Sequence, residues 1–426
     1  MIPFILAVGE AIASKPMLNT NCGEKCVAVS GNSKPTFFNM KKVFLLLVTF
    51  ISFNCYSQPA AKDSMFLSIS PMVDTESSFN KGLIETLKNF LLTKNNAYWQ
   101  NKFWLQSEFK TNVYPFYDLY NIENSKLGKG FYKPSLMEII PTDSANQKIV
   151  KIAFIGHDNK TNENILRTVY NIVATKNDSG IVFSMYLNFI TKHWKETKIG
   201  SVTYKISPEA CRTLNMAEAL KQKEEIAELC DFFGTVPIPT TYYSCINPVE
   251  VFQIKGFDYN PLMYVDKSGG LNEPGDIVIS GNNSDYYMHE ITHIYIAHLF
   301  PSINSFLNEG FAMLIGGSGK FNYEWHRNKM KKYLEDNPDF SFAGHTINTW
   351  EPLFIDKETQ ITYMLGALVC ERTLRLYGKE KLFEIFKSKK SLFETLADVG
   401  LTKANLDEEL RKEINLPLTP VLHKRD

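Results

Sequence analysis

Two histidines four residues apart, with a glutamate between them, constrain the fold of this chain more than any other feature. The segment His289-Glu290-Ile291-Thr292-His293 is followed, after fifteen further residues, by Glu309. Residues four apart lie on one face of an α-helix, so His289 and His293 can both direct an imidazole nitrogen at one metal ion. Glu290 is rotated to the side, where it can reach a water molecule but not the metal. The spacing predicts a Zn²⁺ site with Glu309 as the third protein ligand and Glu290 as general base.

The flanks of this segment also indicate a helix. Ser284 and Asp285 are candidate N-caps, the residues after them are mostly apolar, and Pro301 ends the run. His298 would lie about 140° around that helix from His293, so we expect it to face away from the metal.

The metzincin class of zinc proteins is excluded by two positions. Its His-Glu-x-x-His-x-x-Gly-x-x-His pattern needs a glycine and a third histidine, where this chain has Ile296 and Leu299.

The residues around Glu309 resemble a known family. Phe306–Ala312 reads Phe-Leu-Asn-Glu-Gly-Phe-Ala, which is similar to the second zinc helix of the gluzincin metallopeptidases, whose aminopeptidase branch carries Trp-Leu-Asn-Glu-Gly-Phe-Ala. The resemblance implies Zn²⁺ on His289, His293 and Glu309, a peptide or protein substrate, and hydrolysis with Glu290 as the base. The Gly-x-Met-Glu-Asn motif of that branch is absent, so nothing favours an exopeptidase over an endopeptidase.

A second segment resembles the same branch. Tyr363-Met364-Leu365-Gly366-Ala367 is similar to its Tyr-x-Lys-Gly-Ala pattern, with Leu365 in place of the lysine. The resemblance implies that Tyr363 donates its hydroxyl to the oxyanion that forms when a peptide carbonyl is attacked. His326 and His345 are the alternatives for that role.

The residues before the metal helix suggest where a substrate would bind. Leu262–Val265 and Asp276–Ser280 are β-prone runs on either side of the turn-rich residues 268–275. In gluzincins an edge strand before the metal helix binds the substrate main chain by β-addition. The resemblance therefore implies that Asp276–Ser280 is that edge strand.

The pattern of apolar residues predicts an α+β protein with two folded domains. Residues 81–94 form an amphipathic helix, and β-rich runs follow at 136–141, 148–155, 166–176, 180–190 and 196–206, with a hairpin turn at Asn177–Gly180. A helix followed by an antiparallel sheet resembles the NTF2-like fold. We therefore expect an accessory binding or docking domain over residues 60–207, and a gluzincin-type domain, mainly helical with a small sheet, over residues 208–426.

Within the second domain we expect one strand and several helices. The strand covers 240–245, the helices cover 215–233, 323–334, 362–377, 379–387, 391–399 and 403–414, and the tail 417–426 is expected to fray.

The N-terminal region carries a predicted secretory signal peptide over residues 40–57. Met40-Lys41-Lys42 precedes a short apolar run, and small residues permit cleavage after Ser57. Because this signal works only near a terminus, we expect translation to start at Met40, with residues 1–39 an upstream extension. The mature protein would be secreted or periplasmic. No later run of 18 apolar residues occurs, so we do not expect it to span a membrane.

The charge content argues against a nucleic-acid partner, and the cysteine content leaves the disulfide pairing open. Lys plus Arg and Asp plus Glu both number 46, so no basic face for nucleic acid is expected. Export permits disulfides, and the four cysteines after residue 57 allow three full pairings or none at all. They are Cys211, Cys230, Cys245 and Cys370.

Two rival functions remain at this point. A gluzincin-fold binding protein that turns nothing over, with or without zinc, would have no need of a base, so Glu290 favours an enzyme. A hydrolase acting on a bond other than a peptide is the other rival. The natural substrate, the cleavage preference and the oligomeric state cannot be read from one sequence.

Overall fold

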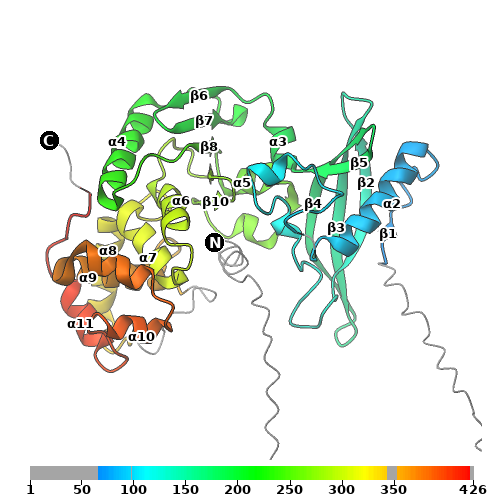
Figure 1. Cartoon of the computed structure of the whole chain (residues 1–426). Helices are drawn as coiled ribbons and strands as arrows, with labels where there is room; N and C mark the ends of the chain where they lie inside the picture. The colour runs from blue at the N-terminus through cyan, green and yellow to red at the C-terminus, as the bar shows by residue number, and fades with distance from the viewer. Residues whose placement is uncertain (1–65, 97, 343–352, 423–426) are drawn as a thin grey trace, which may run out of the picture. The chain divides into compact units, whose positions relative to one another are not determined.

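The computed structural model describes residues 66–96, 98–342 and 353–422, and these form an α+β fold with two mixed sheets (Figure 1). The described residues all belong to one compact unit. The predicted signal peptide and the extension before it lie outside the described residues.

The first sheet has six strands and is mainly antiparallel, as the sequence predicts. Its order is β1-β2-β3-β4-β5, with β9 paired to β4, and only β1 and β2 run parallel. The predicted hairpin turn is confirmed by the pairing of Asn177 with Gly180. The strands are β1 (Ser68–Ile69), β2 (Lys133–Pro141), β3 (Gln147–Asp158), β4 (Glu163–Asn177), β5 (Gly180–Ser184) and β9 (Phe257–Tyr259).

Helix α2 (Ser78–Thr93) packs against one face of this sheet, which confirms the predicted amphipathic helix (Figure 1). Ser77 caps it by accepting a hydrogen bond from the Asn80 N–H at 3.2 Å. Its buried Leu83, Leu87 and Phe90 join a core with the inward side chains of the strands. The same region contains the short helices η1 (Glu108–Lys110), η2 (Tyr117–Leu119) and α3 (Tyr186–Ile190). The described residues up to Ile190 are called the first part of the chain below.

The second sheet has the order β10-β11-β8-β7-β6. Its strands are β6 (Glu196–Ile199), β7 (Val202–Ile206), β8 (Thr240–Ser244), β10 (Gly270–Glu273) and β11 (Ile277–Ser280). Residues 196–206 were grouped with the first sheet on the sequence, and that grouping is wrong, because β7 pairs in parallel with β8. Strands on both sides of the predicted boundary at residue 207 therefore share one sheet.

The predicted edge strand Asp276–Ser280 is not at an edge. Strand β11 lies between β10 and β8 and pairs with both. A tight turn through Gly275 and Asp276, both with positive φ, folds β10 back along β11. The two edges of the described sheet therefore belong to β10 and β6, and β10 is the edge next to β11.

The rest of the second part is helical, and the predicted helices are confirmed within a few residues. They are α4 (Met216–Phe233), α6 (Met288–Leu299), α7 (Ser305–Gly316), α8 (Tyr323–Asp336), α9 (Ile361–Phe386, broken at Gly378), α10 (Leu392–Ala397) and α11 (Leu406–Glu413). Helix α5 (Pro248–Lys255) was not predicted from the sequence. Leu262–Val265 is not a strand: Asn260 caps and Pro261 starts the short helix η4 (Pro261–Tyr264).

The described part of the C-terminal tail is docked rather than frayed. The Thr419 N–H donates to Glu371 Oε1 at 2.9 Å, and Val421 and Leu422 pack against the helical core. A buried carboxylate that accepts a main-chain hydrogen bond holds the segment in place.

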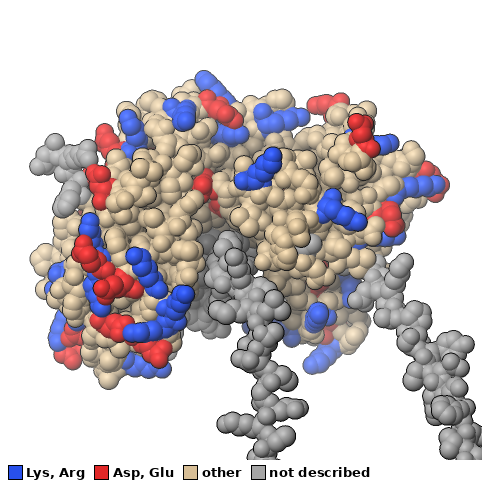
Figure 2. All heavy atoms as spheres, viewed as in Figure 1, with Lys and Arg blue, Asp and Glu red and all other residues tan. Residues whose placement is uncertain are grey.

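Three further features of the described residues concern the surface charge, the cysteines and possible membrane spans. Acidic and basic side chains are interspersed over the described residues on the face drawn in Figure 2. All four described cysteines are free thiols. Among the described residues, no helix has the length and apolar content needed to cross a membrane.

Candidate metal centre

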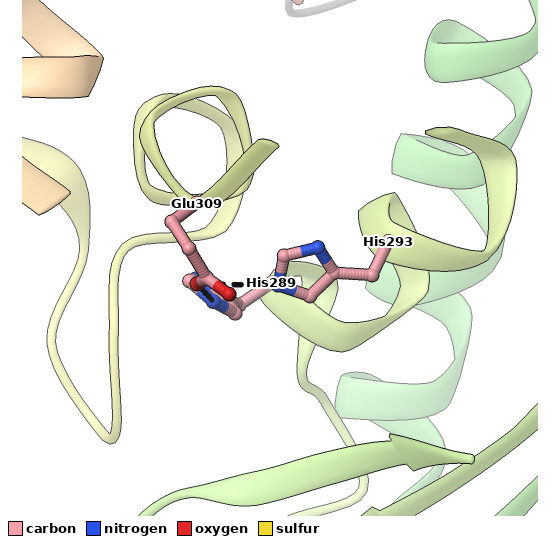
Figure 3. A group of neighbouring side chains, drawn as sticks. All are labelled: His289, His293 and Glu309. Carbon is pink, nitrogen blue, oxygen red and sulfur yellow. Dashed lines mark ion pairs between the residues drawn. The ribbon is translucent and has the colours of Figure 1, made fainter. Parts of the chain in front are cut away.

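Three ligand-type side chains converge from two helices (Figure 3). His289 and His293 lie on α6 and Glu309 on α7, and one ligand atom from each lies within 4.8 Å of the other two. Both histidine Nε2 atoms are 3.5 Å from Glu309 Oε2. None of the three residues is more than 3% exposed. The structure thus brings together the three residues that the sequence singled out.

Each histidine is oriented by a hydrogen bond at its other ring nitrogen. His289 Nδ1 lies 2.5 Å from the carbonyl oxygen of Gly317, and His293 Nδ1 lies 2.9 Å from Asn308 Oδ1. A carbonyl oxygen only accepts hydrogen bonds, so Nδ1 carries the proton in each ring. Whenever such a ring is neutral, its Nε2 carries the lone pair and points toward Glu309, as a metal ligand requires.

Two of the three donor separations match those around a small tetrahedral cation. Ligand atoms about 2.1 Å from a tetrahedral Zn²⁺ stand about 3.4 Å apart, and both imidazole–carboxylate separations are 3.5 Å. That distance is long for a hydrogen bond between charged groups.

Several buried polar atoms at this place have no hydrogen-bond partner among the described residues. They are His293 Nε2, Glu309 Oε1 and Oε2, Glu290 Oε2 and the Tyr363 hydroxyl. Buried polar atoms without partners are rare and costly, and those of His293 and Glu309 belong to the group of converging ligand atoms. Two imidazoles and one carboxylate are the donors that Zn²⁺ takes in catalytic sites, so the residues present fit the ion.

The charges of these groups are strongly coupled. Burial favours the neutral acid of Glu309, but the two imidazoles outweigh it and hold the pKa of that carboxyl below its usual range. Burial likewise opposes protonation of His293, but Glu309 outweighs it and raises the pKa of His293 to about 9. The centre therefore has an ionised carboxylate and attracts a positive charge, which a proton or a cation can supply.

Glu290 lies beside the ligands without joining them. Burial raises the pKa of its carboxyl, while His289 and His293 and the backbone N–H of Asn272 act to lower it. A carboxylate with a raised pKa accepts a proton more readily at neutral pH, which suits a general base.

Helix α6 is held by burial and by a neighbouring helix rather than by a cap of its own. Residues Met288–Ile296 are all buried. The predicted caps Ser284 and Asp285 are wrong, because the helix begins after Tyr287 and has no side-chain cap. Asp285 instead forms a two-pronged ion pair with Arg212, at 2.6 and 2.9 Å. The Tyr287 N–H is satisfied by Gln222 Oε1 of α4 at 2.7 Å.

Two glycines explain how Tyr363 reaches the centre. A Cβ on Gly310 would lie 2.2 Å from the backbone of Gly366, and one on Gly366 would lie 2.5 Å from the Phe306 carbonyl oxygen. Helices α7 and α9 therefore touch backbone to backbone, which only residues without a side chain permit. This contact places the start of α9, with Tyr363, beside Glu309.

Tyr363 faces the metal ligands. It is 1% exposed, and its ring lies nearly parallel to that of His289 with centroids 6.2 Å apart. Burial and the neighbouring Glu309 carboxylate raise the pKa of its hydroxyl well above the usual value. It therefore stays protonated at neutral pH and can donate a hydrogen bond.

Two other histidines that were weighed from the sequence, His326 and His298, are engaged elsewhere. Both ring nitrogens of His326 are engaged, with Thr359 Oγ1 at 2.9 Å and the Ser318 carbonyl oxygen at 3.1 Å. His298 is exposed and paired with Asp276 at 2.7 Å, so it faces away from the ligands as expected. His345 lies outside the described residues.

A groove in the same region stops short of the candidate ligands. It has a volume of about 680 Å³, and its walls include Tyr287, Gly316 and Gly319 but none of the three candidate ligands. Gly316 packs closely against the start of α6, since a Cβ there would lie 2.1 Å from the His289 backbone nitrogen.

Some functional candidates were missed by sequence reasoning. Asn308 and Gly317 orient the histidines, and Asn272 and Tyr287 flank Glu290 and His289. The asparagine before Glu309 could have been noticed, because an asparagine next to a ligand is well placed to reach a neighbouring histidine. The others depend on tertiary contacts and left no signal in the sequence.

We expect Asn308→Ala to weaken zinc binding by about 10- to 100-fold, the usual cost of losing a residue that orients a ligand. The affinity is measured by competition with a fluorescent chelator. Asn304→Ala is the matched control: Asn304 caps the same helix by accepting from Phe306 N, so its loss lowers the melting temperature and leaves the affinity intact. An unchanged affinity in Asn308→Ala contradicts the orienting role.

The chain was compared with protein-family models and with curated proteins. No protein-family model matches the chain, and no similar curated protein is found.

Proposed function

We propose that this protein is an exported zinc metallopeptidase of the gluzincin type. One observation carries the proposal: His289, His293 and Glu309 bring three ligand atoms together in the interior, and the neighbouring Glu290 and Tyr363 are also buried, each with a polar atom that has no hydrogen-bond partner among the described residues. Two imidazoles and a carboxylate would hold the ion, and the remaining two residues are a base and a hydrogen-bond donor. A non-catalytic metal site needs neither of these.

The chemistry is divided among the residues. When bound, Zn²⁺ supplies Lewis acidity, which lowers the pKa of a water molecule and polarises a carbonyl. Glu290 takes the proton of the attacking water and passes it to the leaving amine. Tyr363 donates its hydroxyl hydrogen to the carbonyl oxygen as negative charge develops there.

Strand β10 is proposed as the surface that aligns the substrate, in place of β11. The Gly281 N–H donates to the Gly269 carbonyl oxygen, and Gly270 is paired opposite Ser280. Hydrogen bonding alternates along an antiparallel pair, so the main-chain groups of Gly270 and Asn272 point to the free edge. An extended peptide can add to that edge as a further strand, with Glu290 close by.

The fold of the first part stays a proposal as well. One helix packed on a mainly antiparallel sheet supports the NTF2-like likeness, and the helical part with its small sheet supports the gluzincin likeness.

The test combines metal analysis with cleavage. The purified protein is expected to hold about one Zn²⁺ per chain and to cut members of a peptide library read by mass spectrometry. A chelator should abolish cleavage and added zinc should restore it. Stoichiometric zinc with no cleavage of any peptide contradicts the peptidase proposal and favours the binding protein.

Replacing Tyr363 by phenylalanine tests the proposed oxyanion donor. We expect Tyr363→Phe to lower kcat by about 10²–10³-fold, the usual cost of one such donor. Zinc content and KM should change little, because the interaction belongs to the transition state. Steady-state kinetics on a cleaved library peptide give both constants.

The control for that experiment is Tyr295→Phe. Tyr295 is also a fully buried tyrosine, and its hydroxyl accepts from the Ile238 N–H at 3.0 Å. Its loss should lower stability without changing kcat. If Tyr363→Phe behaves in the same way as this control, Tyr363 is a packing residue.

A further inference from the structure

A buried lysine joins the first part of the chain to strand β10. Lys255 Nζ lies 2.6 Å from Glu273 Oε1, 3.2 Å from Asp118 Oδ1 and 2.7 Å from the Tyr117 hydroxyl. The Tyr117 hydroxyl also donates to Glu273 Oε2 at 2.5 Å. Lys255, Asp118 and Glu273 are each at most 7% exposed.

The four residues come from three separate segments. Tyr117 and Asp118 belong to η2, which lies over the core of the first sheet; Lys255 ends α5; and Glu273 is the last residue of β10. A buried network of this kind adds little to stability compared with apolar packing, but it fixes one arrangement, because any other leaves a charge unpaired.

The turn after β10 is held against the same region. Gly275 has φ 92°, and a Cβ on it would lie 2.4 Å from the Thr111 carbonyl oxygen. The backbone of the β10–β11 turn therefore rests directly on the residue after η1. Both Glu273 and the turn that follows it are thus held by the first part of the chain.

This strand is the one that borders the candidate centre. A hydrogen bond from the backbone N–H of Asn272 helps to lower the pKa of the Glu290 carboxyl. The next residue, Glu273, is bound by Tyr117 and Lys255. Adjacent residues of one strand move together, so fixing Glu273 also fixes the outward main-chain groups of Asn272 and Gly270.

We propose that Tyr117 and Asp118 are positioning residues, through which the first part of the chain fixes β10 for binding an extended peptide. The inference rests on the proposed peptidase function for its substrate, but the anchoring itself does not. It gives the first part a role within the same molecule: it sets the position of the edge that aligns the peptide bond with Glu290.

The test removes one hydroxyl and reads the strand directly. In Tyr117→Phe, we expect amide hydrogen exchange in peptides covering residues 270–273 to become about tenfold faster, the scale of losing one hydrogen bond to a charged group. Exchange in α6 and the zinc content should stay unchanged. For a cleaved peptide, KM should rise by about tenfold while kcat stays within about twofold, because substrate alignment is lost and the catalytic groups remain.

Tyr114→Phe is the matched control. Tyr114 is 4% exposed, and its hydroxyl makes no hydrogen bond among the described residues, so this variant should match the wild type in exchange and in KM. Glu273→Gln keeps the shape of its side chain but weakens the ion pair with Lys255, and should move the same two quantities as Tyr117→Phe.

The outcomes separate the two proposals. Unchanged exchange over residues 270–273 in both Tyr117→Phe and Glu273→Gln overturns the anchoring, whatever the enzyme does. Faster exchange with unchanged KM overturns the role in substrate binding. Faster exchange in a protein that cleaves no peptide supports the anchoring and places the failure in the proposed function.

Discussion

Zinc is expected to leave the protein when Glu309 is replaced by alanine. Glu309 is the one carboxylate among the three candidate ligands, and both of its oxygens are buried without a hydrogen-bond partner in the described part of the chain. The loss in affinity should exceed the ~10–100-fold cost of losing a residue that only orients a ligand. All zinc-dependent cleavage should disappear with the metal. Metal content after dialysis, measured by emission spectrometry, gives the result.

Thermal unfolding provides a second readout that needs no substrate. A ligand that binds only the folded state stabilises it by about 2.7 kcal/mol at 100 times its Kd. Added zinc should therefore raise the melting temperature of the wild type but not of Glu309→Ala. The control is Glu324→Ala, in an exposed first turn of α8, which should keep both the metal and the shift. Full zinc content in Glu309→Ala rules out the assigned ligand set.

The two histidines of the candidate metal centre could be predicted to lie together because their geometry is local. His289 and His293 share a helical face by spacing alone, and the run around Glu309 indicated a second helix. The histidine pair needed only the 3.6-residue period of a helix. The second helix with Glu309 was predicted from the resemblance of Phe306–Ala312 to a known motif. That the two helices lie side by side was expected because all three side chains can bind one Zn²⁺. The apolar pattern of neither helix indicates it.

Strand neighbours could not be predicted in the same way. Asp276–Ser280 has the composition of a strand, but whether it is an edge depends on which strands flank it, and β8 lies more than 30 residues earlier in the chain. The same holds for residues 196–206, which follow the first sheet in sequence and pair with the second. Period-two patterns show that a strand exists and leave its partners open.

Other details depend on contacts that the sequence does not encode locally. Ser284 and Asp285 are good caps by residue type, but Asp285 is drawn to Arg212 and the helix starts later. The position of Tyr363 depends on the contact of Gly310 with Gly366, more than 50 residues apart. The Lys255 network joins three segments whose polar residues are unremarkable when read singly.

Replacing Glu290 by glutamine is expected to separate metal binding from catalysis. Glutamine keeps the shape of the side chain but cannot accept a proton. Because Glu290 is not one of the ligands, zinc content and the zinc-induced rise in melting temperature should match the wild type. The kcat for peptide hydrolysis should fall by at least ~10²-fold, the range for losing a general base. Parallel metal analysis and steady-state kinetics on one preparation test both halves.

Glu225→Gln is the matched control for Glu290→Gln. Burial raises the pKa of Glu225 as it raises that of Glu290, but Glu225 lies on α4 and hydrogen-bonds the Tyr286 hydroxyl at 2.6 Å. The same chemical change away from the metal ligands should leave kcat unaltered. If Glu290→Gln turns over as fast as Glu225→Gln, Glu290 is not the base. Because zinc is measured on the same preparation, a loss of metal cannot be mistaken for a loss of the proton acceptor.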